Sequence, residues 1–118
     1  MTILPEARRL WKDSWRPMKI LAIEHDPPNA SDDQFTPAVL QAEARRAWEL
    51  HQAGIIREFY FRADRDEAVL VLECATVEEA REVLNALPLV REKLIGFELI
   101  PLKAYPGFAR LFSDDAQR

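Results

Sequence analysis

The sequence predicts one α+β domain whose elements follow the order β-α-β-β-α-β. Two apolar runs of strand length, residues 18–24 and 67–74, are continuous enough to be buried on both faces of a sheet. Two other stretches have the apolar spacing of helices, and each begins at a capping threonine, Thr36 or Thr76. A short polar turn, residues 63–66, joins the second and third strands as an antiparallel hairpin.

The composition describes a globular protein and excludes several functional classes. The 118 residues suit one domain, and the net charge of −4 disfavours a general nucleic-acid binder, which needs a basic surface to meet phosphates. No stretch has the ~20 apolar residues of a membrane-spanning helix, and the charged N-terminus lacks the apolar core of a secretory signal. The one cysteine, Cys74, allows no internal disulfide. We therefore expect a cytoplasmic protein that contacts neither nucleic acid nor membrane.

Residues 1–17 are predicted to form a helical extension ahead of the domain. Its apolar residues recur near helical spacing and include two tryptophans: Leu4, Ala7, Leu10, Trp11 and Trp15. We expect this extension to cover either a neighbouring subunit or its own domain. Residues 18–24 then form the first strand, and the polar, proline-containing residues 25–35 form a long loop, a kind of segment that is often a lid or binding loop.

The first helix of the domain begins at Thr36 with Pro37 in its first turn, and Gly54 ends it. Its inner stripe is predicted to consist of Leu40, Ala44, Ala47, Trp48 and His51. Residues 55–62 follow as a second strand, whose mixture of charges and aromatic rings is typical of a sheet edge.

The second helix of the domain begins with a capping box formed by Thr76 and Glu79, and Pro88 ends it. Its buried residues are predicted to be Val77, Ala80, Val83, Leu84 and Leu87. Residues 89–95 are a connector, and residues 97–105 form the fourth strand, where Pro101 has no N–H to donate and therefore requires an edge, a bulge or an unpaired side. Residues 107–118 form a tail with one apolar patch: Phe108, Leu111 and Phe112.

This element order is the split βαβ, or ferredoxin-like, arrangement, in which residues 18–106 form a four-stranded antiparallel sheet with both helices on one face. The first and third strands are central, which suits their apolar character. Because those two strands are apolar on both sides, the helices leave one apolar sheet face uncovered. Packing this face against a second copy removes the exposure, so we predict a homodimer closed into a barrel-like sandwich, a dimeric α/β barrel.

Residues 18–106 resemble the muconolactone isomerase family of the dimeric α/β-barrel superfamily, whose small-molecule enzymes often assemble into larger rings. The resemblance rests on the helix end Glu49-Leu50-His51-Gln52-Ala53-Gly54, on the strand that carries Arg57, on Leu87-Pro88-Leu89 and on Pro106 after the last strand. It implies the fold and a small-molecule substrate. This chain departs from the family pattern at Glu58, where the family tends to have a histidine, and at Ala104-Tyr105, where it tends to have Arg-His. Leu21 and Ile23 stand where the family offers polar groups from its first strand.

Proton transfer beside a carbonyl needs a base and a hydrogen-bond donor for the developing oxyanion. The candidate bases are His25, which ends the first strand beside the long loop, and Glu58 on the second strand, and the candidate oxyanion donor is Tyr60. Arg57 and Arg62 are candidates to bind a substrate carboxylate, with Trp48 as a further substrate contact. The alternative interpretation is structural: a solvated histidine in a loop, and edge-strand charges that prevent sheets from sticking together.

These residues lead to a hypothesis of a cofactor-independent isomerase that acts on a small acidic or lactone metabolite. A non-catalytic ligand-binding or assembly protein of the same fold is the alternative, and a cofactor-free monooxygenase is a third possibility. The sequence has no paired-cysteine or clustered-histidine spacing for a metal and no glycine-rich phosphate loop. The two main hypotheses differ in whether His25, Glu58 and Tyr60 converge on one cavity.

Overall fold

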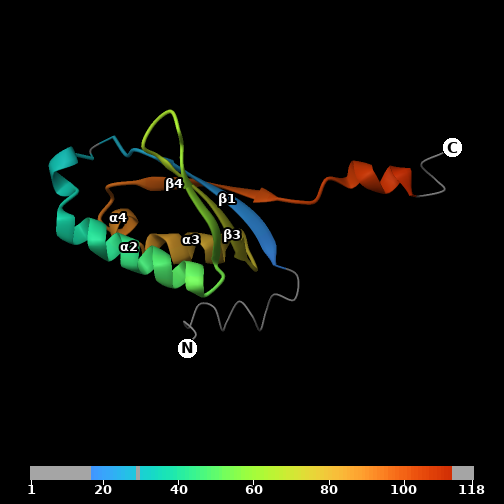
Figure 1. Ribbon diagram of the computed structural model, residues 1–118, viewed down its shortest axis with the longest axis horizontal. Coiled ribbons are helices and arrows are strands. Elements are labelled where there is room, and N and C mark those ends of the chain that lie inside the picture. Colours follow the sequence, from blue (N-terminus) through green and yellow to red (C-terminus); the bar gives the residue numbers. More distant parts are fainter. Residues whose placement is uncertain (1–16, 29, 113–118) are drawn as a thin grey trace.

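The computed structural model describes residues 17–28 and 30–112. The predicted helix within residues 1–16 and the end of the tail, residues 113–118, lie outside these ranges. Figure 1 shows helices and strands in the predicted alternation, with three further short helical turns. The elements are β1 (Met18–His25), η1 (Asp32–Gln34), α2 (Pro37–Gln52), β2 (Ile56–Phe61), β3 (Ala68–Cys74), α3 (Val77–Asn85), α4 (Pro88–Arg91), β4 (Gly96–Leu102) and η2 (Pro106–Leu111).

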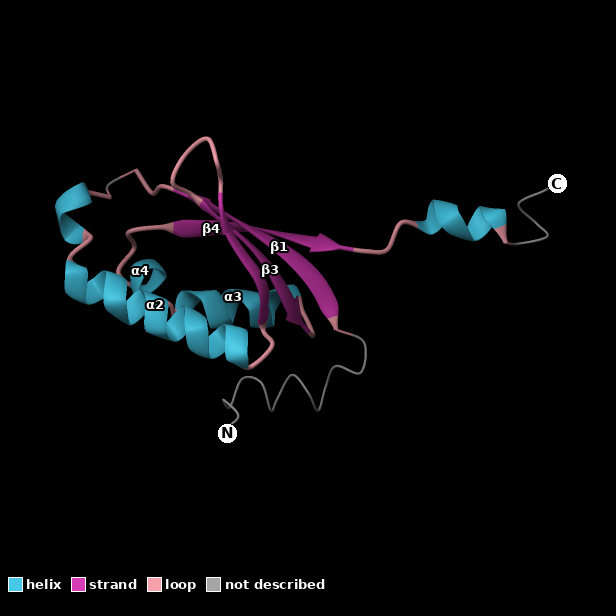
Figure 2. Ribbon diagram, viewed as in Figure 1, coloured by secondary structure: helices cyan, strands magenta, loops and turns pink. Residues whose placement is uncertain are grey.

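The four strands form one antiparallel sheet in the order β2-β3-β1-β4. The predicted central strands, β1 and β3, are therefore central, and β4 is an edge strand, which accommodates Pro101. The helices α2, α3 and α4 lie together on one side of the sheet (Figure 2). This α+β arrangement is compatible with a ferredoxin-like fold. No helix within the described ranges is long and apolar enough to cross a membrane.

The core lies between the sheet and its helices. Burial alternates along β3, where Ala68, Leu70, Leu72 and Cys74 are buried and the residues between them are half-buried. Because alternate residues of a strand point to opposite faces, the first set faces the helices and the second faces away from them. From the helices, Leu50, Val83 and Leu84 pack into the same apolar cluster. The helices thus bury the centre of one face and leave the centre of the other half-buried.

Both threonine caps form as predicted. The Thr36 hydroxyl accepts the backbone N–H of Val39 at 3.2 Å, and the Thr76 hydroxyl accepts that of Glu79 at 3.1 Å. These bonds satisfy backbone donors that have no partner within the first helical turn. Gly54 adopts φ 82° just after α2, the left-handed conformation that glycine reaches without steric cost.

The inner stripe predicted for α2 is wrong for four of its five residues. Ala47 is buried, whereas Leu40, Ala44, Trp48 and His51 are exposed. The helix instead turns Val39, Glu43, Ala47 and Leu50 inward. One reason is a polar contact that apolar periodicity does not reveal: the Glu43 carboxylate accepts the backbone N–H of Leu89 at 2.9 Å and so connects α2 to α4.

The chain between α3 and β4 also differs from the prediction. Pro88 does not simply end a helix but occupies the first turn of α4, where its missing N–H costs nothing. Leu87 is buried as expected, although it caps α4 rather than belonging to α3. The fourth strand ends at Leu102 instead of residue 105, and a six-residue 3-10 helix, η2, follows it.

A pair of leucine substitutions tests the orientation of α2. Leu50 is 0% exposed and Leu40 is 45% exposed. We expect Leu50→Ala to lower the free energy of unfolding by about 3 kcal/mol, because it removes buried methyl groups and leaves a cavity. Leu40→Ala, on the same helix, is expected to cost less than about 1 kcal/mol. Urea unfolding of dilute protein measures both changes in the free energy of unfolding. The reverse ranking would support the inward stripe predicted from the sequence.

Glu43 makes stability depend on pH in a defined direction. Burial raises the pKa of the Glu43 carboxyl, and its hydrogen bond from Leu89 only partly offsets this effect. Since the folded-state pKa is raised, stability is lost as pH rises through the raised value. Glu43→Gln keeps an acceptor oxygen but does not ionise, so its stability relative to the wild type should increase from acidic to neutral pH. Urea unfolding across that range measures the difference, and a constant difference would contradict this role.

Candidate functional site

The sheet face that points away from the helices, here called the open face, is apolar at its centre. Its aliphatic side chains come from three strands and are half-buried in the single chain: Leu21, Ile23, Val69, Val71 and Ile100. The register places Leu21 between Val71 and Ile100, so these residues form one continuous patch. Lys19, Glu58, Tyr60, Glu73 and Glu98 surround this patch.

Glu58 and Tyr60 form a hydrogen-bonded pair at the β2 side of the open face. Glu58 lies opposite Val71 and Tyr60 lies opposite Val69, so both belong to the face away from the helices. The Tyr60 hydroxyl donates to the Glu58 carboxylate at 2.7 Å. This bond, together with the negative charge of Glu58, raises the pKa of Tyr60. The pair combines a carboxylate base with a phenol donor beside an apolar surface, which suits proton transfer.

The two candidate arginines are engaged by acidic side chains. The Arg62 guanidinium donates two hydrogen bonds to Asp64, at 2.8 and 2.6 Å, and lies 3.5 Å from Glu67, within the β2–β3 turn. Arg62 in turn lowers the pKa of Asp64. Strict alternation along β2 would place Arg57 on the same face as Phe59, but a bulge between Ile56 and Glu58 interrupts it. The Arg57 Nε atom lies 4.0 Å from Glu73. A ligand carboxylate would have to compete with these acidic partners.

His25 lies in a different part of the molecule. It lines a small cavity of about 180 Å³ with residues of α3 and β4, and its ring lies against Gly96, where an added Cβ would meet it at 2.5 Å. Glu58 and Leu21 both lie opposite Val71 of β3, and Leu21 comes four residues before His25 along β1. His25 therefore does not converge with the Glu58–Tyr60 pair in the single chain, and all three side chains are exposed.

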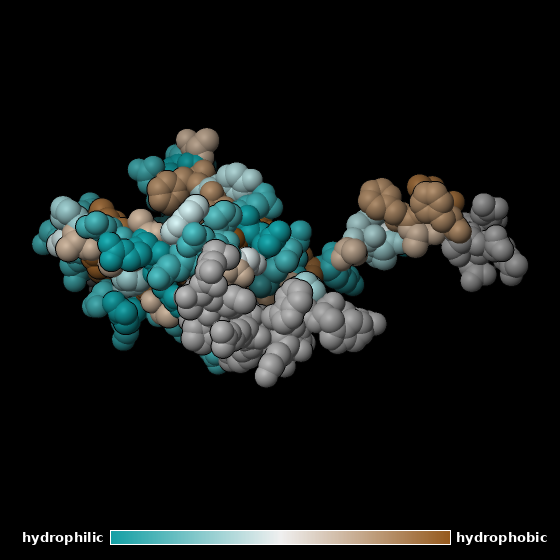
Figure 3. Space-filling view, turned by 60° about the horizontal axis from the view of Figure 1, so that its bottom comes forward, coloured by the Kyte–Doolittle hydropathy of each residue, from teal (hydrophilic) through white to brown (hydrophobic). Residues whose placement is uncertain are grey.

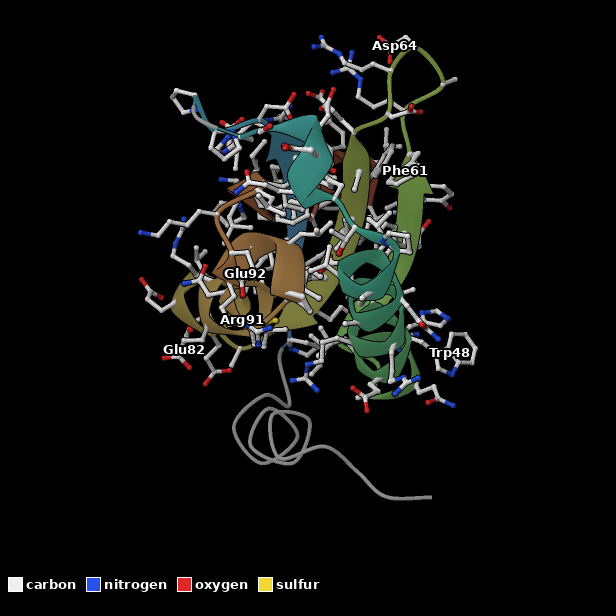
Figure 4. All side chains as sticks on the ribbon, turned by 90° about the vertical axis from the view of Figure 1, so that its left-hand side faces the viewer. Trp48, Phe61, Asp64, Glu82, Arg91 and Glu92 are labelled. Atoms are coloured by element: carbon white, nitrogen blue, oxygen red, sulfur yellow. The ribbon has the colours of Figure 1, made fainter. Side chains whose placement is uncertain are left out.

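Trp48 does not line the cavity at His25. Its side chain is 58% exposed on α2 and its ring lies 5.6 Å from that of His51. His51 Nδ1 lies 2.9 Å from the backbone oxygen of Ile56, the first residue of β2. Figure 4 shows Trp48 and Phe61 on the same side of the molecule, where α2 runs beside β2. Trp48 thus belongs to an exposed surface at the β2 edge.

A larger cavity, of about 650 Å³, lies where the long loop meets α2 and the end of β2. None of the site residues predicted from the sequence lines it. Its walls combine carboxylates with apolar side chains: Glu24, Asp26, Pro27, Ala30, Asp32, Phe35, Leu40, Phe61 and Asp66. The sequence signal that points to it is the lid-like loop of residues 25–35. Among the described residues, its lining contains four carboxylates and no lysine or arginine, so this cavity disfavours an anionic ligand.

Glu24 lines this cavity and also accepts a hydrogen bond from the sheet. Its carboxylate accepts the backbone N–H of Ala68 at 2.9 Å, which connects the end of β1 to the start of β3. Burial raises the pKa of Glu24, and the neighbouring charge of Asp26 raises it further. Glu24 therefore has a structural task that the sequence did not reveal. Within residues 17–28 and 30–112, no three histidine, cysteine or acidic side chains are arranged to hold a metal ion.

Comparison of the chain with protein-family models yields no match, and no curated protein matches it either. The site must therefore be interpreted from its own chemistry. Among the predicted residues, the structure brings together only Glu58 and Tyr60.

The Glu58–Tyr60 bond can be tested by titration. In a Tyr105→Phe background, Tyr60 is the one tyrosine left in the chain. Adding Glu58→Gln removes the negative charge that opposes ionisation of the phenol, so we expect the pKa of Tyr60 to fall. Near-ultraviolet absorbance of the tyrosinate follows the titration. An unchanged midpoint would show that the pair does not form in solution.

Proposed function

We propose that this protein is a homodimeric, cofactor-independent enzyme of the muconolactone-isomerase-like kind, which moves a proton within a small lactone-type metabolite. The observation that carries the proposal is the 2.7 Å hydrogen bond between Tyr60 and Glu58 beside an apolar sheet face. Glu58 would remove a proton next to the ring carbonyl, and its protonation would end its role as acceptor for the Tyr60 hydroxyl. The single phenolic hydrogen of Tyr60 would then turn from Glu58 to the oxyanion that develops. Return of the proton at another carbon completes an isomerisation without any redox partner.

The homodimer supplies the enclosure that this chemistry needs. Five aliphatic residues form the half-buried centre of the open face, and a second copy packed on them would exclude water from both faces. Excluding water strengthens the hydrogen bonds and charges at the edge of the patch, where Glu58 and Tyr60 lie. A ligand held between the two sheets would lie within reach of this pair.

The charge distribution narrows the substrate class within this proposal. The large cavity carries four carboxylates, and Arg57 and Arg62 already have acidic partners. A neutral lactone avoids the repulsion that an acid would meet at either place. We therefore prefer the lactone to the acid as substrate. His25 lies apart and has no step in this mechanism.

A non-catalytic ligand-binding or assembly protein is the second candidate. The observation that favours it is the exposure of His25, Glu58 and Tyr60 and their failure to converge on one cavity in the single chain. The two candidates make different demands on Glu58, because binding alone does not require a base.

The experiment compares Glu58→Gln with Glu78→Gln, a control that removes an exposed carboxylate from the first turn of α3, on the helix side of the sheet. Thermal unfolding of the wild type against a panel of lactones and carboxylic acids identifies a ligand, since binding to the folded state raises stability by ~2.7 kcal/mol at a hundredfold excess over Kd. Deuterium uptake from solvent into that ligand then measures proton transfer.

We expect the wild type and Glu78→Gln to catalyse the exchange, and Glu58→Gln to lower its rate by about 10²-fold or more. Tyr60→Phe should lower the rate as well, by loss of the oxyanion donor. A ligand that stabilises the wild type but exchanges no deuterium would favour the binding protein. Exchange that survives Glu58→Gln would place the base elsewhere.

A further inference from the structure

The cavity at His25 takes no part in the proton transfer proposed above. Its volume is about 180 Å³, and residues of β1, α3, α4 and β4 line it. Phe97 and Leu99, which line it from β4, lie opposite Glu24 and Ala22 of β1. Because Ala22 is buried beneath the helices, this register places both β4 residues on the helix side of the sheet. The cavity is therefore built by one chain, on the side away from the open face.

A glycine in β4 lets the imidazole ring of His25 line this cavity. His25 lies opposite Gly96 in the register of β1 and β4. A Cβ atom at position 96 would meet His25 Cε1 at 2.5 Å and Nε2 at 2.9 Å, closer than such atoms approach one another. Any other residue at this position would therefore displace the ring. The location of His25 thus depends on a close contact with the strand beside it.

Three polar side chains with N–H groups line the cavity: His25, Arg81 and Asn85. No acidic residue within the described ranges lines it. Within those ranges Arg81 has no acidic partner, whereas Arg57 and Arg62 lie beside Glu73 and Asp64. The cavity at His25 therefore offers hydrogen-bond donors and a positive charge, the reverse of the larger cavity with its four carboxylates. This chemistry favours an anion.

The remaining walls of the cavity are apolar. Leu84 and Phe97 are buried and Leu99 is half-buried. These walls are separate from the exposed apolar side chains of residues 105–112, which Figure 3 shows in brown beside a largely hydrophilic body. An aliphatic chain would gain from contact with the walls, whereas a bare inorganic anion would not. The volume is small compared with the ~300 Å³ at which pockets for drug-sized ligands begin, so the ligand must be small.

The direction of α3 indicates where a carboxylate would bind. Asn85 is the last residue of this helix, and the free carbonyl groups at a helix C-terminus carry partial negative charge. Arg81 lies one turn earlier on the same side of α3. A carboxylate at Arg81 avoids those carbonyl groups and can accept two parallel hydrogen bonds from the guanidinium. His25 can donate a further hydrogen bond from the end of β1.

We infer that the cavity at His25 binds a small monocarboxylate with a short aliphatic chain. The carboxylate lies at Arg81 and His25, and the chain lies against Leu84, Phe97 and Leu99. This site goes beyond the proposed function and does not depend on it, because the Glu58–Tyr60 pair belongs to the open face and the cavity lies on the helix side.

Titration of the full-length protein with butanoate, followed by ¹H–¹⁵N NMR at constant pH and ionic strength, tests the site. We expect saturable shifts of the backbone amide signals of Asn85 and Gly96. Arg81→Gln should raise the Kd for butanoate by about tenfold or more, because it removes a charged donor. Arg45→Gln, which removes an exposed arginine of α2 that does not line the cavity, is the matched control and should leave Kd unchanged. An Arg81→Gln protein that binds as tightly as the control would overturn the inference.

Gly96→Ala tests the role of His25 without changing any polar group. Alanine is compatible with the extended backbone of β4, but its Cβ would displace the imidazole ring. We expect Gly96→Ala and His25→Ala to raise the Kd for butanoate by a similar factor, about threefold or more, through loss of one hydrogen bond. Unchanged binding by both variants would remove His25 from the site.

Two further probes test the ligand class. Butanamide has the same chain without the charge, and sulfate has charge without a chain. Both should bind more weakly than butanoate by about tenfold or more. Butanamide that binds as tightly would show an apolar crevice without recognition of an anion. Sulfate that binds as tightly would show an anion site in which the aliphatic chain has no role, and either result would overturn the assigned class.

The inference and the proposed function fail separately. Glu58→Gln should retain butanoate binding, and Arg81→Gln should retain any deuterium exchange into a lactone. Absence of exchange together with saturable butanoate binding at Gly96 would refute the proposed function and support this site. Exchange that depends on Glu58, in a protein whose Asn85 and Gly96 signals do not respond to butanoate, would support the enzyme and overturn the carboxylate site.

Discussion

The pairing of β1 with β3 is the interaction on which the rest of the structure depends. Ile20 lies opposite Leu72 and Ala22 opposite Leu70, and all four side chains are fully buried beneath the helices. The other strands extend this centre and α2, α3 and α4 pack on it: β2 and β4 add to its edges, and the three helices cover one side. The same two strands carry aliphatic residues on their other side as well. The pairing that builds the core therefore also creates the apolar open face.

The uncovered apolar surface is concentrated in three places, and each follows from the strand order. The open face lies behind the central strands, the exposed rings of Phe59 and Phe61 lie along β2, and the exposed side chains of residues 103–112 follow β4. A single chain has no element left within its described residues to cover any of them. A second copy packed on the open face would cover the first of these places.

Whether a charged side chain can bind a ligand or transfer a proton depends on the groups around it. The arginines expected to bind an anion hold acidic partners, and the carboxylates around the long loop make the large cavity unfavourable for anions. Glu24 and Glu43, which no motif singled out, accept backbone N–H groups and connect distant elements. Glu58 and Tyr60 are the predicted pair that remains together, because the strand places them two residues apart on one face.

The sequence by itself determined the order of elements, the central strands, both threonine caps and the turn at Gly54. These depend on local stereochemistry and on hydrophobic period, which act within a few residues. Only the tertiary structure decided which side of α2 faces inward, because the bond from Leu89 to Glu43 joins residues 46 positions apart. The tertiary structure also decided the bulge at Arg57, the separation of His25 from Glu58, and the exposure of the apolar side chains in residues 103–112. Each of these depends on which distant elements meet, a property that periodicity along one segment cannot express.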